Sequence, residues 1–285
     1  MKSLFLLCTL LISIIKLGAQ GYVSVELDGQ FGNQLFRIAA AYTYSLDHQL
    51  PLTVPDLVHK KNLNIPLNAT RLFLNKIDHY ELPSPPNLHW KEPSFNYSKI
   101  PYASKIKLYG WLQSEKYFKH RRKEILDLFA APPELNELIL AKYPFLSSSA
   151  LVVGVQIRDY RKEMPTEAYH PTVKRNYYEK AFSRFPDDAI FLISSNNNSF
   201  AKECTEGLKP NLIYLNENDY IEEFYTLVLC KSFIISNSSF GWWASWLSTA
   251  PNKIVIAPTP WFAPPYNNEV MMRDLLPPEY QIISH

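Results

Sequence analysis

The sequence of 285 residues is poor in cysteine, with 3, and in glycine, with 8, although it contains 22 prolines. Few glycines and many prolines indicate stiff, defined loops rather than flexible linkers. Cys8 lies in the N-terminal segment, while Cys204 and Cys230 either form a disulfide or remain buried thiols. No Cys, His, Asp or Glu residues have the spacing of metal ligands, so we predict no metal site and no cofactor.

A strong charge of one sign is also missing, because the formal net charge is only +2 and no basic run occurs. Nucleic-acid binding usually needs a basic patch, so we predict no nucleic-acid partner. The hydrophobic content of 47% is ample for a core. The length fits either two lobes of ordinary domain size or one large α/β domain.

The N-terminus has the character of a targeting signal. Lys2 precedes an apolar stretch from Leu4 to Ile15, and small residues end the segment at Leu17–Ala19. The stretch is too short for an ordinary transmembrane span. We therefore predict that residues 1–20 are a signal peptide, with a short uncleaved anchor or a buried strand as alternatives. The signal implies the secretory pathway or another extracytoplasmic compartment.

Strand-like and helix-like segments alternate in the rest of the chain. A strand at 22–27 leads through a turn with two glycines to a helix at 35–46, and the proline-rich residues 51–101 predict loops and short helices. From 147 onwards, strands are predicted at 151–157, 189–193, 212–215, 233–235 and 253–257, with helices between them. This alternation predicts an α/β fold with parallel sheets. We place the N-terminal lobe at 21–146 and the C-terminal lobe at 147–285.

Three polar features follow predicted strands, where ligands of parallel sheets bind. They are the Gly29–Gln34 loop, the pair Arg158–Asp159 and the segment Ser236–Ser239. Arg158 offers a planar fork for phosphate, and the Ser and Asn residues predict a capped helix start whose N–H groups attract anions. Together they suit a pyrophosphate group. The alternatives are a surface ion pair for Arg158 and an ordinary capped core helix at 236–247.

Several motifs then occur in the order found in one family. They are Gly29-Gln30-Phe31-Gly32-Asn33-Gln34-Leu35-Phe36, Gly110-Trp111-Leu112-Gln113-Ser114-Glu115-Lys116-Tyr117-Phe118, Asn176-Tyr177-Tyr178, Cys230 through Leu247, and Val255 to Phe262. By these motifs, residues 22–262 resemble glycosyltransferase family 11, the alpha-1,2-fucosyltransferases. The resemblance implies a GT-B-like fold of two Rossmann-type lobes with a cleft between them. The N-terminal lobe, with its Gly-Asn-Gln loop, is expected on the acceptor side, and the C-terminal lobe is expected to bind the nucleotide sugar.

The resemblance also implies a reaction and its partners. The expected activity is the inverting transfer of L-fucose from GDP-fucose to the 2-hydroxyl of a galactose-terminated glycan, without a metal. The expected location is the Golgi lumen or membrane in a eukaryote, with association through the N-terminus, or the cytoplasm or envelope in a bacterium. A transferase for another nucleotide sugar and an inactive carbohydrate-binding relative are the alternatives.

The resemblance assigns roles to particular residues. The expected catalytic residues are Arg158, Asn33 and Asp159. Arg158 is expected to hold the pyrophosphate and stabilise departing GDP, and Asn33 to lie near the phosphate or fucose. Asp159 is adjacent to Arg158 in the sequence and is expected to orient it. The expected substrate-binding residues are Gly32, Gln34, Ser236, Asn237, Ser238, Ser239 and Phe240. Two departures from the family pattern concern the donor: Gln156 replaces a His, and Asn196-Asn197 replace an Asp pair.

Overall fold

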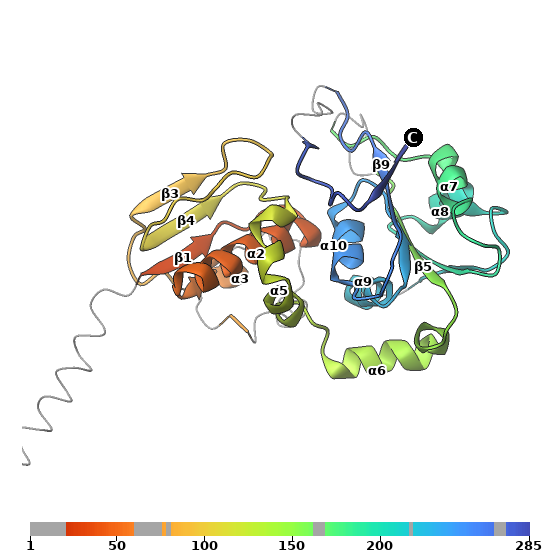
Figure 1. Ribbon diagram of the computed structural model, residues 1–285, viewed down its shortest axis with the longest axis horizontal. Coiled ribbons are helices and arrows are strands. Elements are labelled where there is room, and N and C mark those ends of the chain that lie inside the picture. The colour runs from red at the N-terminus through yellow and green to blue at the C-terminus, as the bar shows by residue number, and fades with distance from the viewer. Residues whose placement is uncertain (1–20, 60–75, 78–80, 162–168, 217–218, 265–271) are drawn as a thin grey trace, which may run out of the picture.

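The computed structural model describes residues 21–59, 76–77, 81–161, 169–216, 219–264 and 272–285. The predicted signal peptide, residues 1–20, lies outside the described residues. Within the described ranges, no helix combines the length and the apolar character that crossing a bilayer requires. The chain forms two lobes that lie side by side (Figure 1), each with its own parallel sheet.

The N-terminal sheet has four strands in the order β2-β1-β4-β3, and neighbouring strands run parallel. Their bounds are Tyr22–Val25 (β1), Leu52–Thr53 (β2), Leu88–Lys91 (β3) and Lys105–Tyr109 (β4). The short helix α3 spans Asp56–His59. The strand β3 was not predicted, because half of its side chains face solvent and prolines precede it closely. Its pairing with the buried strand β4 decides its conformation.

Helix α2 (Phe31–His48) begins four residues before the predicted start. The turn from β1 is completed early because Gly29 adopts a φ of 77°, a conformation that glycine reaches without steric cost. Gly32, Asn33 and Gln34 therefore lie in the first helical turn and not in a loop. The Asn33 and Gln34 N–H groups donate to the Gln30 carbonyl at 2.9 and 3.2 Å, and the aligned peptide dipoles give the start of this helix a partial positive charge.

The C-terminal sheet has six parallel strands in the order β10-β9-β8-β5-β6-β7. The central strand β5 (Val152–Ile157) is buried throughout, which explains its continuous apolar sequence. The other strands are Ile190–Ser195 (β6), Leu212–Tyr214 (β7), Ser232–Ile234 (β8), Val255–Thr259 (β9) and Gln281–Ser284 (β10). The five strands predicted from the sequence are confirmed, and β10 is an additional edge strand.

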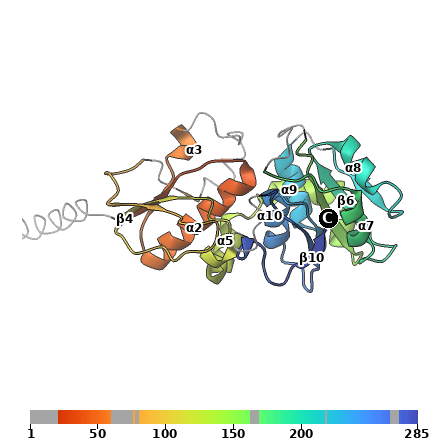
Figure 2. The same ribbon diagram turned by 90° about the horizontal axis from the view of Figure 1, so that it is seen from above.

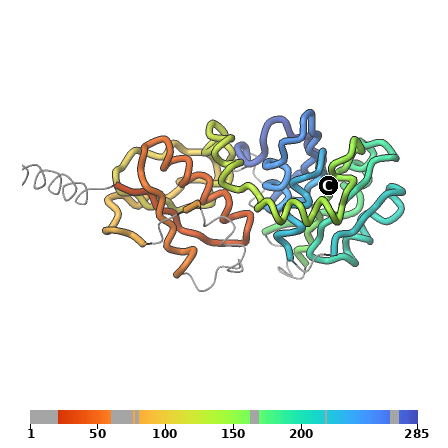
Figure 3. The backbone as a smooth tube through the Cα atoms, turned by 90° about the horizontal axis from the view of Figure 1, so that it is seen from below, coloured from red at the N-terminus to blue at the C-terminus, as the bar shows by residue number. Residues whose placement is uncertain are grey.

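Helices cover the C-terminal sheet, and others join the lobes. The covering helices are Arg175–Phe182 (α7), Asn198–Thr205 (α8), Tyr220–Val228 (α9) and Ser239–Leu247 (α10). The joining segment holds Glu115–Tyr117 (η1), Lys119–Arg121 (η2), Arg122–Leu128 (α5), Pro133–Lys142 (α6) and Pro144–Ser147 (η3). After α5 the chain crosses to the C-terminal lobe and runs along it through α6 (Figure 3).

The lobes meet where α2 and α10 pack against each other (Figure 2). Phe36 of α2 lies 4.4 Å from the ring of Trp242 and 4.9 Å from that of Trp243. One hydrophobic core thus contains residues of both lobes, while a second core lies within the C-terminal lobe beneath α7 and α8. This shared core fixes the two helix starts relative to each other.

Candidate active site

A cleft with a cavity volume of about 260 Å³ lies between the lobes. Its walls come from segments that follow strands of both sheets, as expected for a parallel α/β fold. The residues that line it are Gly29, Gln30, Asn33, Phe95, Trp111, Gln113, Arg158, Tyr160, Tyr169, His170, Asn237, Ser238, Ser239, Trp261 and Phe262.

Two helix N-termini converge on this cleft. The start of α2 carries Asn33, whose Oδ1 accepts hydrogen bonds from Gln113 Nε2 and from Ser239 Oγ, both at 2.9 Å. A Cβ atom at Gly32 would lie 2.6 Å from the carbonyl carbon of Ser239, so only glycine permits this approach. Aligned peptide dipoles make each helix start a site of partial positive charge.

Arg158 adds a full positive charge at the same place. It follows β5 directly, and its guanidinium donates to Gln30 Oε1 at 2.8 Å. The same guanidinium lies 5.8 Å from the ring centre of Tyr160. Arg158 therefore reaches from the C-terminal lobe to the N-cap residue of α2. A cationic fork beside two helix starts has the charge and the hydrogen-bond donors that suit a phosphate or diphosphate group.

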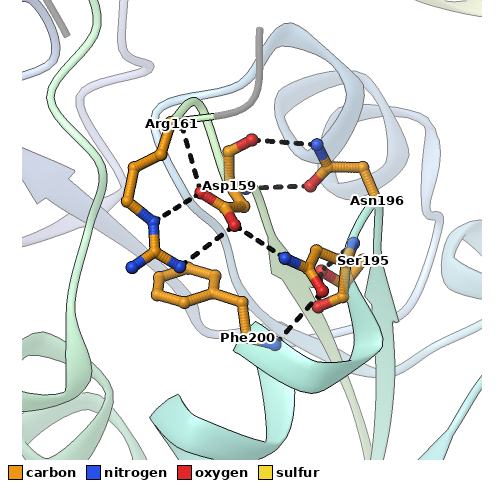
Figure 4. Close-up of polar contacts among 6 residues, drawn as sticks. Asp159, Arg161, Ser195, Asn196 and Phe200 are labelled. Carbon is orange, nitrogen blue, oxygen red and sulfur yellow. Dashed lines mark hydrogen bonds and ion pairs between the residues drawn. The ribbon is translucent and has the colours of Figure 1, made fainter. Parts of the chain in front are cut away.

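The structure does not bring Asp159 into the cleft. Its carboxylate faces away and accepts from Arg161 Nε at 2.8 Å, from Arg161 Nη2 at 3.0 Å and from Asn197 Nδ2 at 2.7 Å. Figure 4 shows this network, with the Arg161 guanidinium over the ring of Phe200. The hydrogen bonds from Arg161 lower the pKa of Asp159 to about 2, so this side chain is a poor proton acceptor.

The amides at 196 and 197 support this network. Asn196 accepts from the Asp159 N–H at 2.8 Å and donates to the Asp159 carbonyl at 3.0 Å. Asn197 caps α8 by accepting from the Phe200 N–H. These residues, where the family pattern has an Asp pair, thus hold the turn that carries Arg158.

The segment Ser236–Phe240 divides between the cleft and the interior. Asn237, Ser238 and Ser239 line the cleft, whereas the Ser236 hydroxyl donates to Gln156 Oε1 at 2.5 Å in the buried sheet. The ring of Phe240 packs on Phe224 at 5.1 Å. Of the predicted substrate-binding residues, Ser236 and Phe240 therefore support the wall from behind.

Gln34 also lies behind the wall, because its Nε2 donates to the Gly29 carbonyl at 2.8 Å and fixes the β1–α2 turn. Asn237 is fully buried, and its Nδ2 donates to the carbonyls of Pro171 and Trp261, both at 2.9 Å. This amide locks three segments of the C-terminal lobe together at the edge of the cleft.

An aromatic wall was missed by the sequence reasoning. The His170 ring stacks on Tyr160 at 4.7 Å and contacts Phe262 at 5.0 Å, and Phe95 of the other lobe contacts Phe262 at 5.1 Å. These residues come from irregular segments, where neither periodicity nor spacing signals a site. The signal in the sequence that could have revealed this wall is the pair Trp261-Phe262, which ends the family motif Val255–Phe262.

The two cysteines of the described residues are free and buried, so the disulfide alternative is wrong. Burial raises the pKa of the Cys204 thiol to about 12. Across the described ranges, no group of three or more His, Cys, Asp or Glu side chains is placed to hold a metal ion.

Comparison with known proteins gives a family match over most of the chain. The model of glycosyl transferase family 11 matches residues 6–274. O-antigen biosynthesis glycosyltransferase WbnK of Escherichia coli is 29% identical over 59% of this chain, and the match spans only 59% of that protein. Alpha-1,2-colitosyltransferase of Escherichia coli is 24% identical over 84% of this chain and 92% of its own length. Galactoside alpha-(1,2)-fucosyltransferase 2 of Oryctolagus cuniculus is 23% identical over 80% of this chain and 68% of its own length.

Solved structures share the fold. A crystal structure of NodZ alpha-1,6-fucosyltransferase soaked with GDP-fucose has a TM-score of 0.51 at 15% identity, covering 83% of this chain and 95% of its own. The fucosyltransferase NodZ from Bradyrhizobium gives a TM-score of 0.50 at 14% identity, again covering 83% of this chain and 95% of its own. The predicted GT-B-like α/β fold is confirmed.

Proposed function

This chain belongs to glycosyltransferase family 11, and on that basis we propose that it transfers L-fucose from GDP-fucose to the 2-hydroxyl of a galactoside, with inversion. The observation that carries this proposal is the convergence of Arg158 and the starts of α2 and α10 on one cleft between two lobes. Such a site fits the diphosphate of a nucleotide sugar better than it fits an uncharged ligand.

The chemistry follows from where charge develops. When the bond between fucose C1 and the diphosphate oxygen breaks, negative charge grows on the departing GDP. Arg158 and the N–H groups at the start of α10 stabilise that charge, which lowers the barrier without any reorganisation of solvent. The acceptor hydroxyl oxygen attacks C1 from the face opposite to GDP and loses its proton to solvent as the bond forms, so the configuration inverts.

Asn33 has a positioning role in this scheme. Its Oδ1 already accepts from Gln113 and Ser239, which leaves its amide N–H groups as the part directed to a substrate. Because Asn33 and Gln113 belong to the N-terminal lobe and Ser239 to the C-terminal lobe, the contact joins both sides of the cleft. We propose that these hydrogen bonds of Asn33 set the distance between the bound donor and the bound acceptor.

The test is turnover by the purified protein in EDTA with GDP-fucose and a β-galactoside. We expect GDP release that depends on the acceptor, and a product in which fucose is linked to O2 of galactose. Arg184→Ala, which removes an exposed arginine outside the cleft, is the matched control for Arg158→Ala. Tight galactoside binding without turnover would instead support the inactive carbohydrate-binding alternative.

A different donor sugar is the second candidate. The similarity to a colitosyltransferase over 92% of that enzyme's length favours this candidate. The Asn196-Asn197 pair, which supports Asp159 instead of offering carboxylates, points the same way. A screen of GDP- and UDP-sugars distinguishes the two candidates, since only the true donor will give acceptor-dependent nucleotide release.

We also propose that the protein works in the secretory pathway, in the Golgi if the host is eukaryotic, because residues 1–20 have the pattern of a targeting signal. N-terminal sequencing of the protein from its own host tests this proposal. A mature chain that begins near residue 20 supports cleavage, and a chain that retains Met1 in the cytoplasm contradicts it.

A further inference from the structure

Trp111 is an exposed indole inside the cleft. Its side chain is 37% exposed and lines the wall that the N-terminal lobe contributes, just after β4. By contrast, Trp242 and Trp243 are completely buried. A large apolar ring held in a cleft and open to solvent is typical of a surface that meets a ligand.

The backbone that presents this ring is strained. Gly110 has a φ of 140°, and Leu112, a branched residue, has a φ of 55° in the left-handed region. Left-handed backbone at a non-glycine residue persists only where surrounding contacts impose it, and it gathers at ligand sites. A Cβ at Gly110 would lie 2.4 Å from the Cβ of Glu92, so the turn is pressed against that residue.

Glu92 supplies the contacts that impose this turn. Its Oε2 accepts from the N–H groups of Trp111 at 2.9 Å and Leu112 at 3.0 Å, and its Oε1 accepts from the Tyr117 hydroxyl at 3.0 Å. Glu92 as a whole is only 9% exposed. Burial raises the pKa of Glu92, while the N–H donors favour its charged form. One buried carboxylate thus holds two successive peptide groups on either side of the Trp111 α-carbon.

Arg37 fixes the ring itself. Its guanidinium lies 5.3 Å from the ring centre of Trp111 and donates to the Glu26 carbonyl at 3.1 Å. Only 3% of Arg37 is exposed, so the cation is held in the interior of the lobe. A buried cation against one part of the ring restricts rotation of the indole through a cation–π attraction.

We propose that Trp111 is the platform on which the acceptor galactoside stacks, positioned by Glu92 and Arg37. This inference rests on the proposed transfer to a galactoside. The C–H bonds on one face of galactose carry partial positive charge, which suits the negative face of an indole. Arg158, the start of α10 and the start of α2 are assigned to the diphosphate, so the part of the N-terminal lobe that follows β4 is left to bind the acceptor.

The first experiment compares Trp111→Ala and Trp111→Phe with the wild type. We expect Trp111→Ala to raise the acceptor KM by about tenfold to a hundredfold, as the loss of a stacked aromatic contact implies. Trp111→Phe should recover part of that loss, and GDP affinity by calorimetry should stay within about twofold in both variants. Tyr102→Ala removes a 65% exposed ring of the same lobe outside the cleft and should change neither value.

The possible results distinguish an acceptor platform from a contact with the donor sugar and from a ring without a binding role. An unchanged acceptor KM in Trp111→Ala, with an active wild type, overturns the platform. Weaker binding of GDP-fucose but not of GDP shows that the ring serves the donor sugar, which also overturns it. If no fucose transfer is detected, an acceptor KM cannot be measured. Lactose is then titrated into the wild type and into Trp111→Ala by calorimetry in the presence of GDP. Lactose binding that Trp111→Ala abolishes supports the platform even if fucose transfer fails, and equal lactose affinity in both proteins rejects it.

Glu92→Gln tests the positioning residue. The variant keeps the size of the side chain. Its NH2 group, which can only donate, must replace one carboxylate oxygen and face either the two backbone N–H donors or the Tyr117 hydroxyl. We expect a higher acceptor KM with kcat at saturation retained within about threefold, because the ring is displaced and not removed. Equal losses of GDP affinity and acceptor affinity would show a general structural role and would contradict the assignment.

Discussion

Replacing Asp159 by Asn separates support of the site from catalysis. The folded protein holds the pKa of Asp159 at about 2, against an ordinary value of 3.8. A difference of that size corresponds to about 2 kcal/mol of unfolding free energy. Asp159→Asn should therefore destabilise the protein by about 2 kcal/mol at pH 7, measured by urea denaturation with an unchanged m value.

The sign of the pH dependence follows from a lowered carboxyl pKa. The stabilisation is fully present above pH 3.8 and is lost as the pH falls through about 2. The difference between wild type and Asp159→Asn should thus shrink by roughly half between pH 7 and pH 3. Glu179→Gln, which breaks an exposed ion pair with Arg175, is the control and should cost less than about 0.5 kcal/mol.

Turnover completes the comparison. Because Asp159 does not line the cleft, Asp159→Asn should retain kcat within about tenfold of the wild type at a temperature where both are folded. A loss in kcat as large as that of Arg158→Ala, together with unchanged stability, would refute the structural role of this carboxylate. A stability difference that is identical at pH 3 and pH 7 would refute the reasoning from its pKa.

Three further predictions concern the cleft itself. Arg158→Ala should lower kcat by about a hundredfold to a thousandfold, the usual cost of losing one group that stabilises developing charge, measured by steady-state GDP release. Gly32→Ala should destabilise the protein by about 1–3 kcal/mol in urea denaturation, because the new Cβ meets the carbonyl carbon and the side chain of Ser239. Asn33→Ala should cost about 1–3 kcal/mol of transition-state stabilisation in kcat/KM, since Gln113 and Ser239 lose a shared acceptor. Wild-type values in any of these assays would contradict the role given to that residue.

Local sequence was enough to predict the elements that present the site. The apolar run of β5 is continuous because both faces of a central parallel strand are covered, and Ser238 does cap α10. Arg158 was found for the same reason, since it is the first residue after that strand. Such features depend on neighbours in sequence, which a pattern can reveal.

The direction in which a side chain points could not be predicted from local sequence. Asp159 follows Arg158, but successive side chains point in different directions, and the distant residue Asn197 fixes the carboxylate on the other side. Trp111 is placed in the cleft by its hydrogen bond to Glu92, a residue that is distant from it in the chain. Phe95 is placed there by its contact with Phe262, and both of these rings lie in irregular segments. Such placements depend on tertiary packing and leave no period in the sequence.

The tryptophans of α10 show how packing extends a local prediction. The sequence predicts a capped helix here, and in the structure Trp243 stacks on Phe118 of the other lobe at 5.1 Å, while Arg122 donates to the Trp246 carbonyl at 2.7 Å. The C-terminal end of α10 thus meets a cation from the N-terminal lobe, while its N-terminal end faces the cleft with the opposite partial charge. The contacts that join the lobes therefore also orient the N-terminal end of this helix toward the cleft.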